Sequence, residues 1–309
     1  MKKSVQPTVA LTDPYSISTK RILAILDKQY KIIRLSSKKK PNGQVKNIPW
    51  YEYNLFDPTS IETGLADVDI AVFFYPVEFP EARLSQASLP NMAALTADSF
   101  ARAARKTGIK KIIYIKPDVR SSTFAASLTE VEKALAASTI PIKTITIPWT
   151  RSEMEKRVSV STGGVRSIQR VLLPPTKDAK WAARYYFDWL GQAGRPLFRT
   201  ESTGSICKVY TRFLKSPLLV LQLSKKSDGW RTIYRITGGI LAKVNDKQSK
   251  MEFCTLPESN HCLVSIHDYH PSLPWFFYKN SQAIIHLLVM HLFGKHLERK
   301  QKESAPFLL

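Results

Sequence analysis

The sequence predicts an α/β protein: a doubly wound parallel sheet in the first half, followed by an α+β domain. Up to residue 150, short apolar segments alternate with helix-like segments. One of them, residues 68–75 (VDIAVFFY), is almost continuously apolar, as expected for a central parallel strand buried on both faces. After Pro148 the alternation stops, and several strand-like segments follow one another between two helices.

Strands and helices alternate in the first half, which implies right-handed crossovers and a parallel sheet. Asp57 is the expected N-cap of one helix, and Gly108 is expected to end another. The predicted strands are residues 9–11, 30–35, 50–54, 68–75, 112–115 and 142–147. The predicted helices are residues 19–28, 58–65, 92–107 and 127–138.

The second half begins after a polar segment, residues 150–164, which is the predicted linker. The expected domains are therefore residues 1–150 and 151–309. A helix is predicted at 177–190, ending before Gly191, and a long helix at 275–297. The predicted strands between these helices are residues 206–213, 218–223, 230–237, 251–255 and 262–266.

Two details complete this second domain. Gly238 and Gly239 indicate a bulge or tight bend, and residues 298–309 are predicted to fray. A long helix lying across a curved sheet is the kind of arrangement that encloses an apolar cavity. We therefore expect a cavity in the second domain.

Composition narrows the class of protein. The net charge of +21 is spread over both halves and favours anionic partners such as lipid headgroups, phosphorylated ligands or nucleic acid. A lysine-rich soluble surface is the alternative, and nucleic acid is not expected because no nucleic-acid-binding motif accompanies the charge. Cys207, Cys254 and Cys262 have no paired spacing, and we find no signal peptide, so a cytoplasmic protein is expected. The sequence does not indicate the oligomeric state.

Six phrases carry a resemblance to known families. The first half resembles the NmrA-like, atypical short-chain dehydrogenase domains in NLFDPTSIETGLADVDIAVFFYPV (54–77), DSFARAARKTGIKKIIYI (98–115) and LTEVEKALAASTIPIKTITIP (128–148). The second half resembles uncharacterised domains that follow such domains in bacteria, in VRSIQRVLLPP (165–175), RTIYRITGGILA (231–242) and SIHDYHPSLPWFFYKNSQAIIHLLVMHLFGKHL (265–297). The resemblance implies a Rossmann-like NAD(P)-binding domain, followed by a domain of unknown function with a START-like helix-grip fold that binds apolar small molecules.

The phosphate-binding loop implied by this resemblance has been rewritten. Dinucleotide-binding folds place a glycine-rich turn after the first strand. Here that turn is residues 12–18 (TDPYSIS), and the first glycine of the chain is Gly43. Pro14 removes an N–H donor and Asp13 adds a negative charge. The chain also contains no Tyr-x-x-x-Lys pair, which provides the proton donor in short-chain dehydrogenases.

If the first domain binds a dinucleotide, NADP is favoured over NAD; binding of no cofactor is the alternative. Basic and hydroxyl residues after the second strand favour a 2′-phosphate, although such a run is also typical of a solvated turn: Arg34, Ser36, Ser37 and Lys38. The other cofactor-binding candidates lie at or just beyond carboxyl ends of strands: Thr12, Asp13, Ser16, Phe74, Tyr75 and Lys116. For the last three, simple strand termination is the alternative.

Anion- and ligand-binding candidates lie in the second half. Arg166 and Arg170 are four residues apart, so on a helix they would share a face and grip a carboxylate or phosphate. A structural pairing with Glu130 or Glu132 is the alternative. The further candidates are Arg231, His267, Trp275 and Tyr278. The last two belong to an aromatic block (PSLPWFFY) that suits a pocket mouth or a membrane surface, with core packing as the alternative.

No metal site is predicted, although all six histidines fall between His261 and His296. His286, His291 and His296 are five residues apart, which turns successive rings about 140° away from each other on a helix. Helical two-histidine sites use a spacing of four.

Two functions stay open at this point. The favoured one is a protein that lacks short-chain dehydrogenase catalysis and binds an apolar or amphipathic small molecule in its second domain. A peripheral membrane contact is an additional expectation. The alternative is an NADP-dependent oxidoreductase with a divergent phosphate loop.

Overall fold

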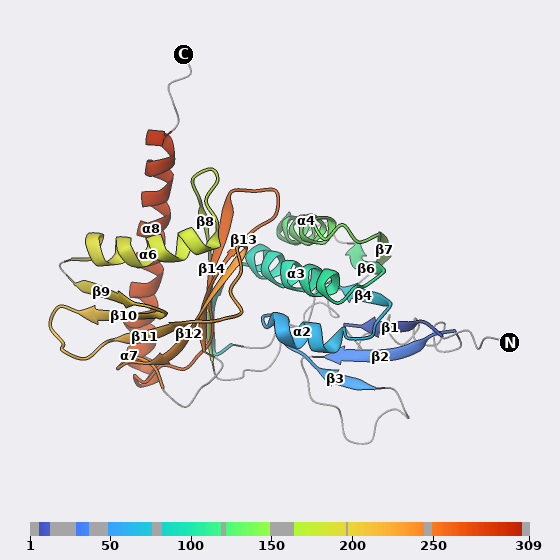
Figure 1. The fold of residues 1–309 in the computed structure, drawn as a ribbon, viewed down its shortest axis with the longest axis horizontal. Coiled ribbons are helices and arrows are strands. Elements are labelled where there is room, and N and C mark those ends of the chain that lie inside the picture. Colours follow the sequence, from blue (N-terminus) through green and yellow to red (C-terminus); the bar gives the residue numbers. More distant parts are fainter. Residues whose placement is uncertain are drawn as a thin grey trace, which may run out of the picture. The chain divides into compact units, whose positions relative to one another are not determined.

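A computed structural model describes residues 6–12, 29–36, 49–75, 82–118, 122–148, 164–195, 197–243 and 249–304 (Figure 1). The chain divides into two compact units. The first unit comprises residues 1–81 and 92–161, and the second comprises residues 82–91 and 162–309. A short piece from the middle of the first half thus belongs to the second unit.

The first unit contains a six-stranded parallel sheet in the order β3-β2-β1-β4-β6-β7. The order reverses between β1 and β4, as in Rossmann-like folds, so the predicted parallel α/β class is confirmed. The strands are β1 Thr8–Leu11, β2 Lys31–Ser36, β3 Trp50–Glu52, β4 Ile70–Phe74, β6 Lys111–Asp118 and β7 Ile142–Pro148. The helices are α2 Pro58–Gly64, α3 Leu89–Lys106, which begins in the second unit, and α4 Ser122–Ala136.

Two local signals in this half of the sequence agree with the structure. Asp57 caps α2, and its carboxylate accepts a hydrogen bond from the Thr59 N–H at 3.2 Å. The apolar segment around β4 is central and buried, and Phe73 packs on Phe100 of α3 with ring centroids 4.6 Å apart. The predicted helix at 19–28 and the predicted linker, apart from Gly164, lie outside the described residues.

The second unit contains an eight-stranded sheet in the order β5-β8-β14-β13-β12-β11-β10-β9. All its neighbours pair antiparallel except β5 and β8, which are parallel. The strands are β5 Leu84–Ala87, β8 Val165–Leu172, β9 Phe198–Thr203, β10 Ile206–Thr211, β11 Leu219–Leu223, β12 Arg231–Gly238, β13 Lys250–Thr255 and β14 His261–Tyr269. The helices are α6 Ala179–Ala193, α7 Trp275–Asn280 and α8 Gln282–Ser304.

The segment with Arg166 and Arg170 is strand β8, so the helical case considered for these two residues does not apply. β8 pairs with β14, which lies about a hundred residues later in the chain, and with β5. Both partners are distant in sequence, so local periodicity does not reveal them. β5 and β9 were also not predicted; β9 (FRTEST) is a largely exposed edge strand without apolar alternation.

Helix α6 passes through Gly191, where it was predicted to end. A Cβ at this position would clash with the Thr200 hydroxyl of β9. That hydroxyl donates a hydrogen bond to the Phe187 carbonyl at 3.0 Å. Gly191 therefore allows strand β9 to approach the helix closely, and it does not terminate the helix.

The predicted C-terminal helix is divided at Ser281, whose hydroxyl donates to the Phe277 carbonyl at 2.5 Å. It also continues to Ser304, so the expected fraying of residues 298–304 is wrong. His296 and Lys300 both bond to the Tyr185 hydroxyl, at 2.7 and 3.2 Å, and so attach the last turns of α8 to α6.

The predicted bend at Gly238 and Gly239 is confirmed. The β11–β12 register shifts between Val220 and Leu221, opposite Gly238. Gly239 has a φ of +113°, and a Cβ there would clash with the Leu218 carbonyl oxygen.

Candidate functional site

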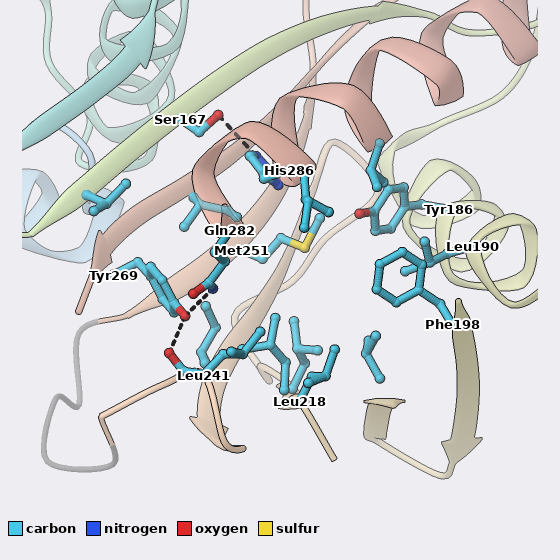
Figure 2. Close-up of a pocket in the computed structure, with 18 of the residues that line it drawn as sticks. Ser167, Tyr186, Leu190, Phe198, Leu218, Leu241, Met251, Tyr269, Gln282 and His286 are labelled. Atoms are coloured by element: carbon cyan, nitrogen blue, oxygen red, sulfur yellow. Dashed lines mark hydrogen bonds between the residues drawn. The ribbon is translucent and has the colours of Figure 1, made fainter. Parts of the chain in front are cut away.

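An apolar cavity lies within the second unit, between one face of its sheet and helices α6, α7 and α8 (Figure 2). Its volume is about 130 Å³, well above what one water molecule needs. Most of its lining is aliphatic or aromatic. Among the lining residues are Tyr186, Leu190, Val209, Leu218, Ile236 and Met251.

The sequence places these side chains on one face by simple alternation. Met251 and Phe253 of β13 point to the cavity side and join its core cluster, whereas Glu252 between them points to the opposite face. Helix α6 contributes a stripe at helical spacing that includes Ala183, Tyr186 and Leu190. The cavity remains because the helices and the sheet do not fill the space between them.

One end of the cavity is polar (Figure 2). The Tyr269 hydroxyl donates its single hydrogen to the Leu241 carbonyl and accepts a hydrogen bond from the Gln282 side-chain amide at 2.6 Å. This arrangement sets the orientation of the Gln282 amide. Its carbonyl oxygen, Oε1, is buried and has no hydrogen-bond partner among the described residues.

His286 lies one helical turn after Gln282 and lines the same cavity. Its Nε2 is 3.1 Å from the Ser167 hydroxyl of β8. Burial lowers the pKa of His286 to about 4, so its ring is neutral near pH 7. Gln282 and His286 therefore form a neutral polar pair on the inner face of α8.

The cavity is uncharged. None of the described residues that line it is Asp, Glu, Lys or Arg. Burial raises the pKa of the Tyr269 hydroxyl to about 12, and burial likewise raises the pKa values of Tyr186 and Tyr278. A charged group placed inside would meet no counter-charge, so the site favours neutral ligands.

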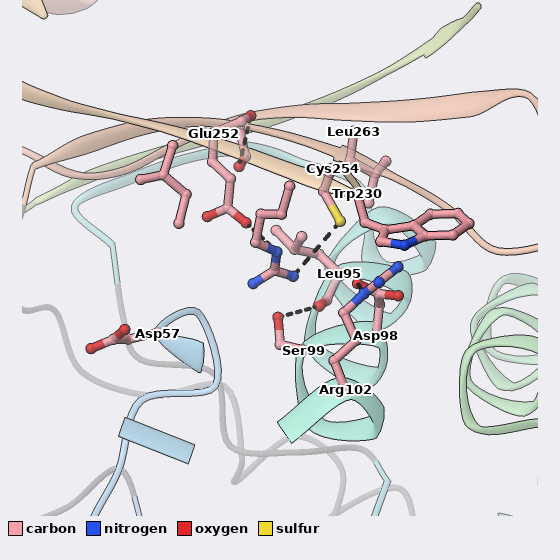
Figure 3. Close-up of polar contacts among 12 residues, drawn as sticks. Asp57, Leu95, Asp98, Ser99, Arg102, Trp230, Glu252, Cys254 and Leu263 are labelled. Atoms are coloured by element: carbon pink, nitrogen blue, oxygen red, sulfur yellow. Dashed lines mark hydrogen bonds and ion pairs between the residues drawn. The ribbon is translucent and has the colours of Figure 1, made fainter. Parts of the chain in front are cut away.

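Three of the predicted anion- and ligand-binding residues, Arg166, Arg231 and His267, lie on the opposite face of the same sheet. Arg231 Nε lies 2.9 Å from Glu252 Oε1, and Lys250 Nζ lies 3.5 Å from Glu252 Oε2. Glu252 and Cys254, labelled in Figure 3, project from the same face of β13. Burial lowers the pKa of His267, and the charges of Lys250, Arg166 and Arg231 lower it further. This cluster is an internal ion-pair network around Glu252.

Arg166 and Arg170 share a face because strand side chains repeat every two residues, and they stand about 13 Å apart. Arg170 Nε donates to the Asn91 side chain at 3.0 Å. Burial lowers the pKa of Arg166 to about 10, and Asp268 partly offsets this.

The aromatic candidates, Tyr278 and Trp275, lie at the cavity or against a residue that lines it. Tyr278 lines the cavity and is buried. Trp275 packs against it with ring centroids 5.6 Å apart, and the Arg83 guanidinium lies 4.1 Å from the Trp275 ring centroid.

Two cofactor candidates of the first unit, Thr12 and Lys116, contact other residues of that unit. The Thr12 hydroxyl accepts from the Phe74 N–H at 3.0 Å, and the Thr12 carbonyl accepts from the Tyr53 hydroxyl at 3.2 Å. Lys116 Nζ lies 2.6 Å from Glu132 Oε1.

The remaining candidates divide into buried and undescribed positions. Phe74 and Tyr75 are fully buried, and burial raises the pKa of Tyr75 to about 12. Arg34 and Ser36 are buried and have partners within the protein. Asp13, Ser16, Ser37 and Lys38 lie outside the described residues.

Neither a metal-binding group nor a membrane-spanning helix is present among the described residues. This part of the chain holds no group of three or more His, Cys, Asp or Glu side chains arranged to bind a metal ion. No helix within the same residues has the length and apolar character needed to cross a bilayer.

The chain thus combines a Rossmann-like parallel α/β unit with an α+β unit that encloses an apolar cavity. No protein-family description matches it. It is 28% identical over 256 residues to the auxiliary protein GraX of Staphylococcus aureus (strain NCTC 8325 / PS 47), covering 82% of this chain and 81% of GraX.

Solved structures align with part of the chain. The triphenylmethane reductase of Citrobacter sp. has a TM-score of 0.39 and 15% identity, covering 48% of this chain and 51% of the reductase. The NADPH-dependent quinone oxidoreductase of Escherichia coli has a TM-score of 0.36 and 17% identity, over 48% and 51%. The chain spans about half the length of these proteins. The Rossmann-like class of the first unit rests on its strand order.

Sequence reasoning missed Ser167, Gln282 and the cavity role of His286. A usable signal was present. Gln282 and His286 are polar residues four apart within an otherwise apolar helical segment, and such a pair marks a polar spot on one helix face. Ser167 carried no comparable signal, because its strand was not recognised.

Acid is expected to destabilise the protein through His286. The folded-state pKa of about 4 lies below the ordinary value of 6.5, so the unfolded chain binds more protons between these values and stability falls as pH drops. At about pH 5 the loss from this ring is about 2 kcal/mol. Thermal melts at about pH 7.5 and pH 5 should therefore differ less for His286→Gln than for the wild type. His291→Asn, a change at an exposed residue of the same helix, is the control. An equal drop in Tm between the two pH values for His286→Gln and the wild type would contradict the assignment.

Proposed function

We propose that the protein binds a neutral amphipathic small molecule in the cavity of its second unit, and that it lacks short-chain dehydrogenase catalysis. The observation that carries this proposal is the unpaired Gln282 Oε1 at the polar end of an uncharged apolar cavity. A buried acceptor without a donor is costly, and a ligand N–H or O–H would satisfy it.

The walls define the rest of the ligand. Tyr186, Leu190 and Ile236 offer apolar surface away from the polar end, which suits an alkyl chain or fused rings. A carboxylate head would be buried without a cation and would lose its hydration. We therefore assign the ligand class as a neutral head group with a hydrogen-bond donor, attached to an apolar body.

The first unit serves in this proposal as a scaffold. Thr12, Lys116, Arg34 and Ser36 already have partners within the protein. Residues 12–18, which follow β1 in the sequence, contain none of the glycines that bring a backbone close to a pyrophosphate.

Filling the cavity should abolish ligand binding. Val289 lines the cavity from α8, and Val289→Trp places a large ring inside it. We expect binding of a fluorescent long-chain alcohol, measured by titration, to fall at least roughly tenfold. Ile284→Trp, on the outer face of the same helix, is the matched control. Equal binding by both variants would place the ligand elsewhere.

The head-group assignment predicts selectivity. A long-chain alcohol should bind better than the fatty acid of equal chain length, because only the alcohol brings a neutral donor to Gln282 Oε1. Gln282→Leu should reduce alcohol affinity roughly five- to tenfold, as expected for one hydrogen bond to a buried group. Gln192→Leu, on an exposed part of α6, is the control. Tighter binding of the fatty acid at neutral pH would exclude this head-group class.

A thermal titration with NADPH separates the proposal from the NADP-dependent oxidoreductase alternative. A dinucleotide at 100-fold excess over its Kd would add about 2.7 kcal/mol and raise the Tm by a few degrees. We expect no rise with NADPH and a rise with the long-chain alcohol. A clear rise in Tm with NADPH would favour the NADP-dependent oxidoreductase alternative.

A further inference from the structure

Helix α8 is apolar on two opposite faces over its first three turns. Its inner face carries Met290 and Phe293, which are buried in the core cluster. Its outer face carries Ile284, Leu288 and Leu292, which are exposed to 57%, 54% and 48%. A helix that is apolar all round normally has both faces covered. The outer face has no cover among the described residues.

Two aromatic side chains add to this exposed apolar surface. Phe276 and Phe277 of α7 are both largely exposed and lie immediately before α8. The bond from the Ser281 hydroxyl to the Phe277 carbonyl joins the two helices. We call Phe276, Phe277, Ile284, Leu288 and Leu292 the outer apolar patch. Exposed apolar side chains gathered on neighbouring elements are typical of an interaction site.

The outer face becomes basic in the second half of α8. Lys295, Arg299 and Lys302 follow the apolar stripe at spacings of three and four residues, and all three are exposed. The acidic residues of the helix are Glu298 and Glu303, which leaves a net positive charge at this end. One helix face is thus apolar over its first turns and cationic over its last.

We propose that the outer face of α7 and α8 docks on the interface of a membrane that contains anionic lipids. The apolar patch would enter the boundary between headgroups and acyl chains, and the basic end would lie among the anionic headgroups. The stripe from Ile284 to Leu292 rises only about 12 Å, which suits a shallow interfacial position.

Charge favours this occupant over a second copy of the chain. Each copy carries a net charge of +21, so two copies meeting at this face would repel each other. An anionic surface is complementary to Lys295, Arg299 and Lys302, and each such residue strengthens binding roughly fivefold. The proposal does not depend on the cavity ligand, because the patch faces away from the cavity.

Vesicle flotation of the full chain tests the docking surface. The probes are phosphatidylcholine vesicles with and without phosphatidylglycerol, at low and physiological salt. We expect binding only to the vesicles that contain phosphatidylglycerol. Leu288→Glu should weaken that binding at least roughly tenfold. Phe213→Glu makes the same charge change at a residue that is 80% exposed between β10 and β11, and should bind like the wild type.

A charge reversal at Lys295 tests the basic end of α8 separately. Lys295→Glu should weaken binding to phosphatidylglycerol vesicles while leaving the Tm unchanged, which keeps the test valid should Leu288→Glu fail to fold. Equal losses in Leu288→Glu and Phe213→Glu would overturn the proposal in favour of attraction by overall charge. Absence of vesicle binding, together with a dimer that Leu288→Glu dissociates in sedimentation, would overturn it in favour of a second copy.

Discussion

Side-chain alternation along the strands of the second sheet is the constraint on which the second unit depends. On β13, Met251 and Phe253 face the helices and the cavity, whereas Glu252 faces the other way into an ion-pair network with Arg231. A shift of one residue in register would exchange the two sets and place a carboxylate in the cavity. The apolar site and the charged cluster are therefore two consequences of one pairing pattern, and charge is kept out of the ligand site by backbone geometry.

Helix α8 connects the interior of this unit to its surface. Its inner face supplies both the polar pair of the cavity, Gln282 and His286, and the buried side chains that hold the helix on the sheet. Its outer face supplies the apolar patch and the basic stripe. Only one helix separates the two surfaces, and Ile285 both lines the cavity and is partly exposed. An amphipathic ligand and a lipid interface are chemically related partners, so one helix serving both is physically coherent.

The first unit has the strand order of a Rossmann-like fold, but its sequence lacks the glycine-rich segment that usually follows the first strand. The strand order depends on buried apolar strands such as β4, and these are intact. In such folds, glycines let backbone N–H groups come close to the phosphates, and this chain has no glycine before Gly43. The hydroxyl and carbonyl of Thr12, which follows β1, accept hydrogen bonds from the Phe74 N–H and the Tyr53 hydroxyl. Core packing and site chemistry are thus encoded by different residues and can diverge separately.

The sequence by itself determined the parallel sheet, the Asp57 cap and the bend at Gly239, because each follows from neighbouring residues: an apolar run, a side-chain acceptor, or a missing Cβ. It also indicated a long C-terminal helix, although its break at Ser281 and its last turns depend on contacts with Phe277 and Tyr185. Only the tertiary structure decided that Arg166 lies on a strand and that His286 meets Ser167 across the cavity. Their partners lie about one hundred residues away in the chain, and no local pattern records a pairing between segments so distant.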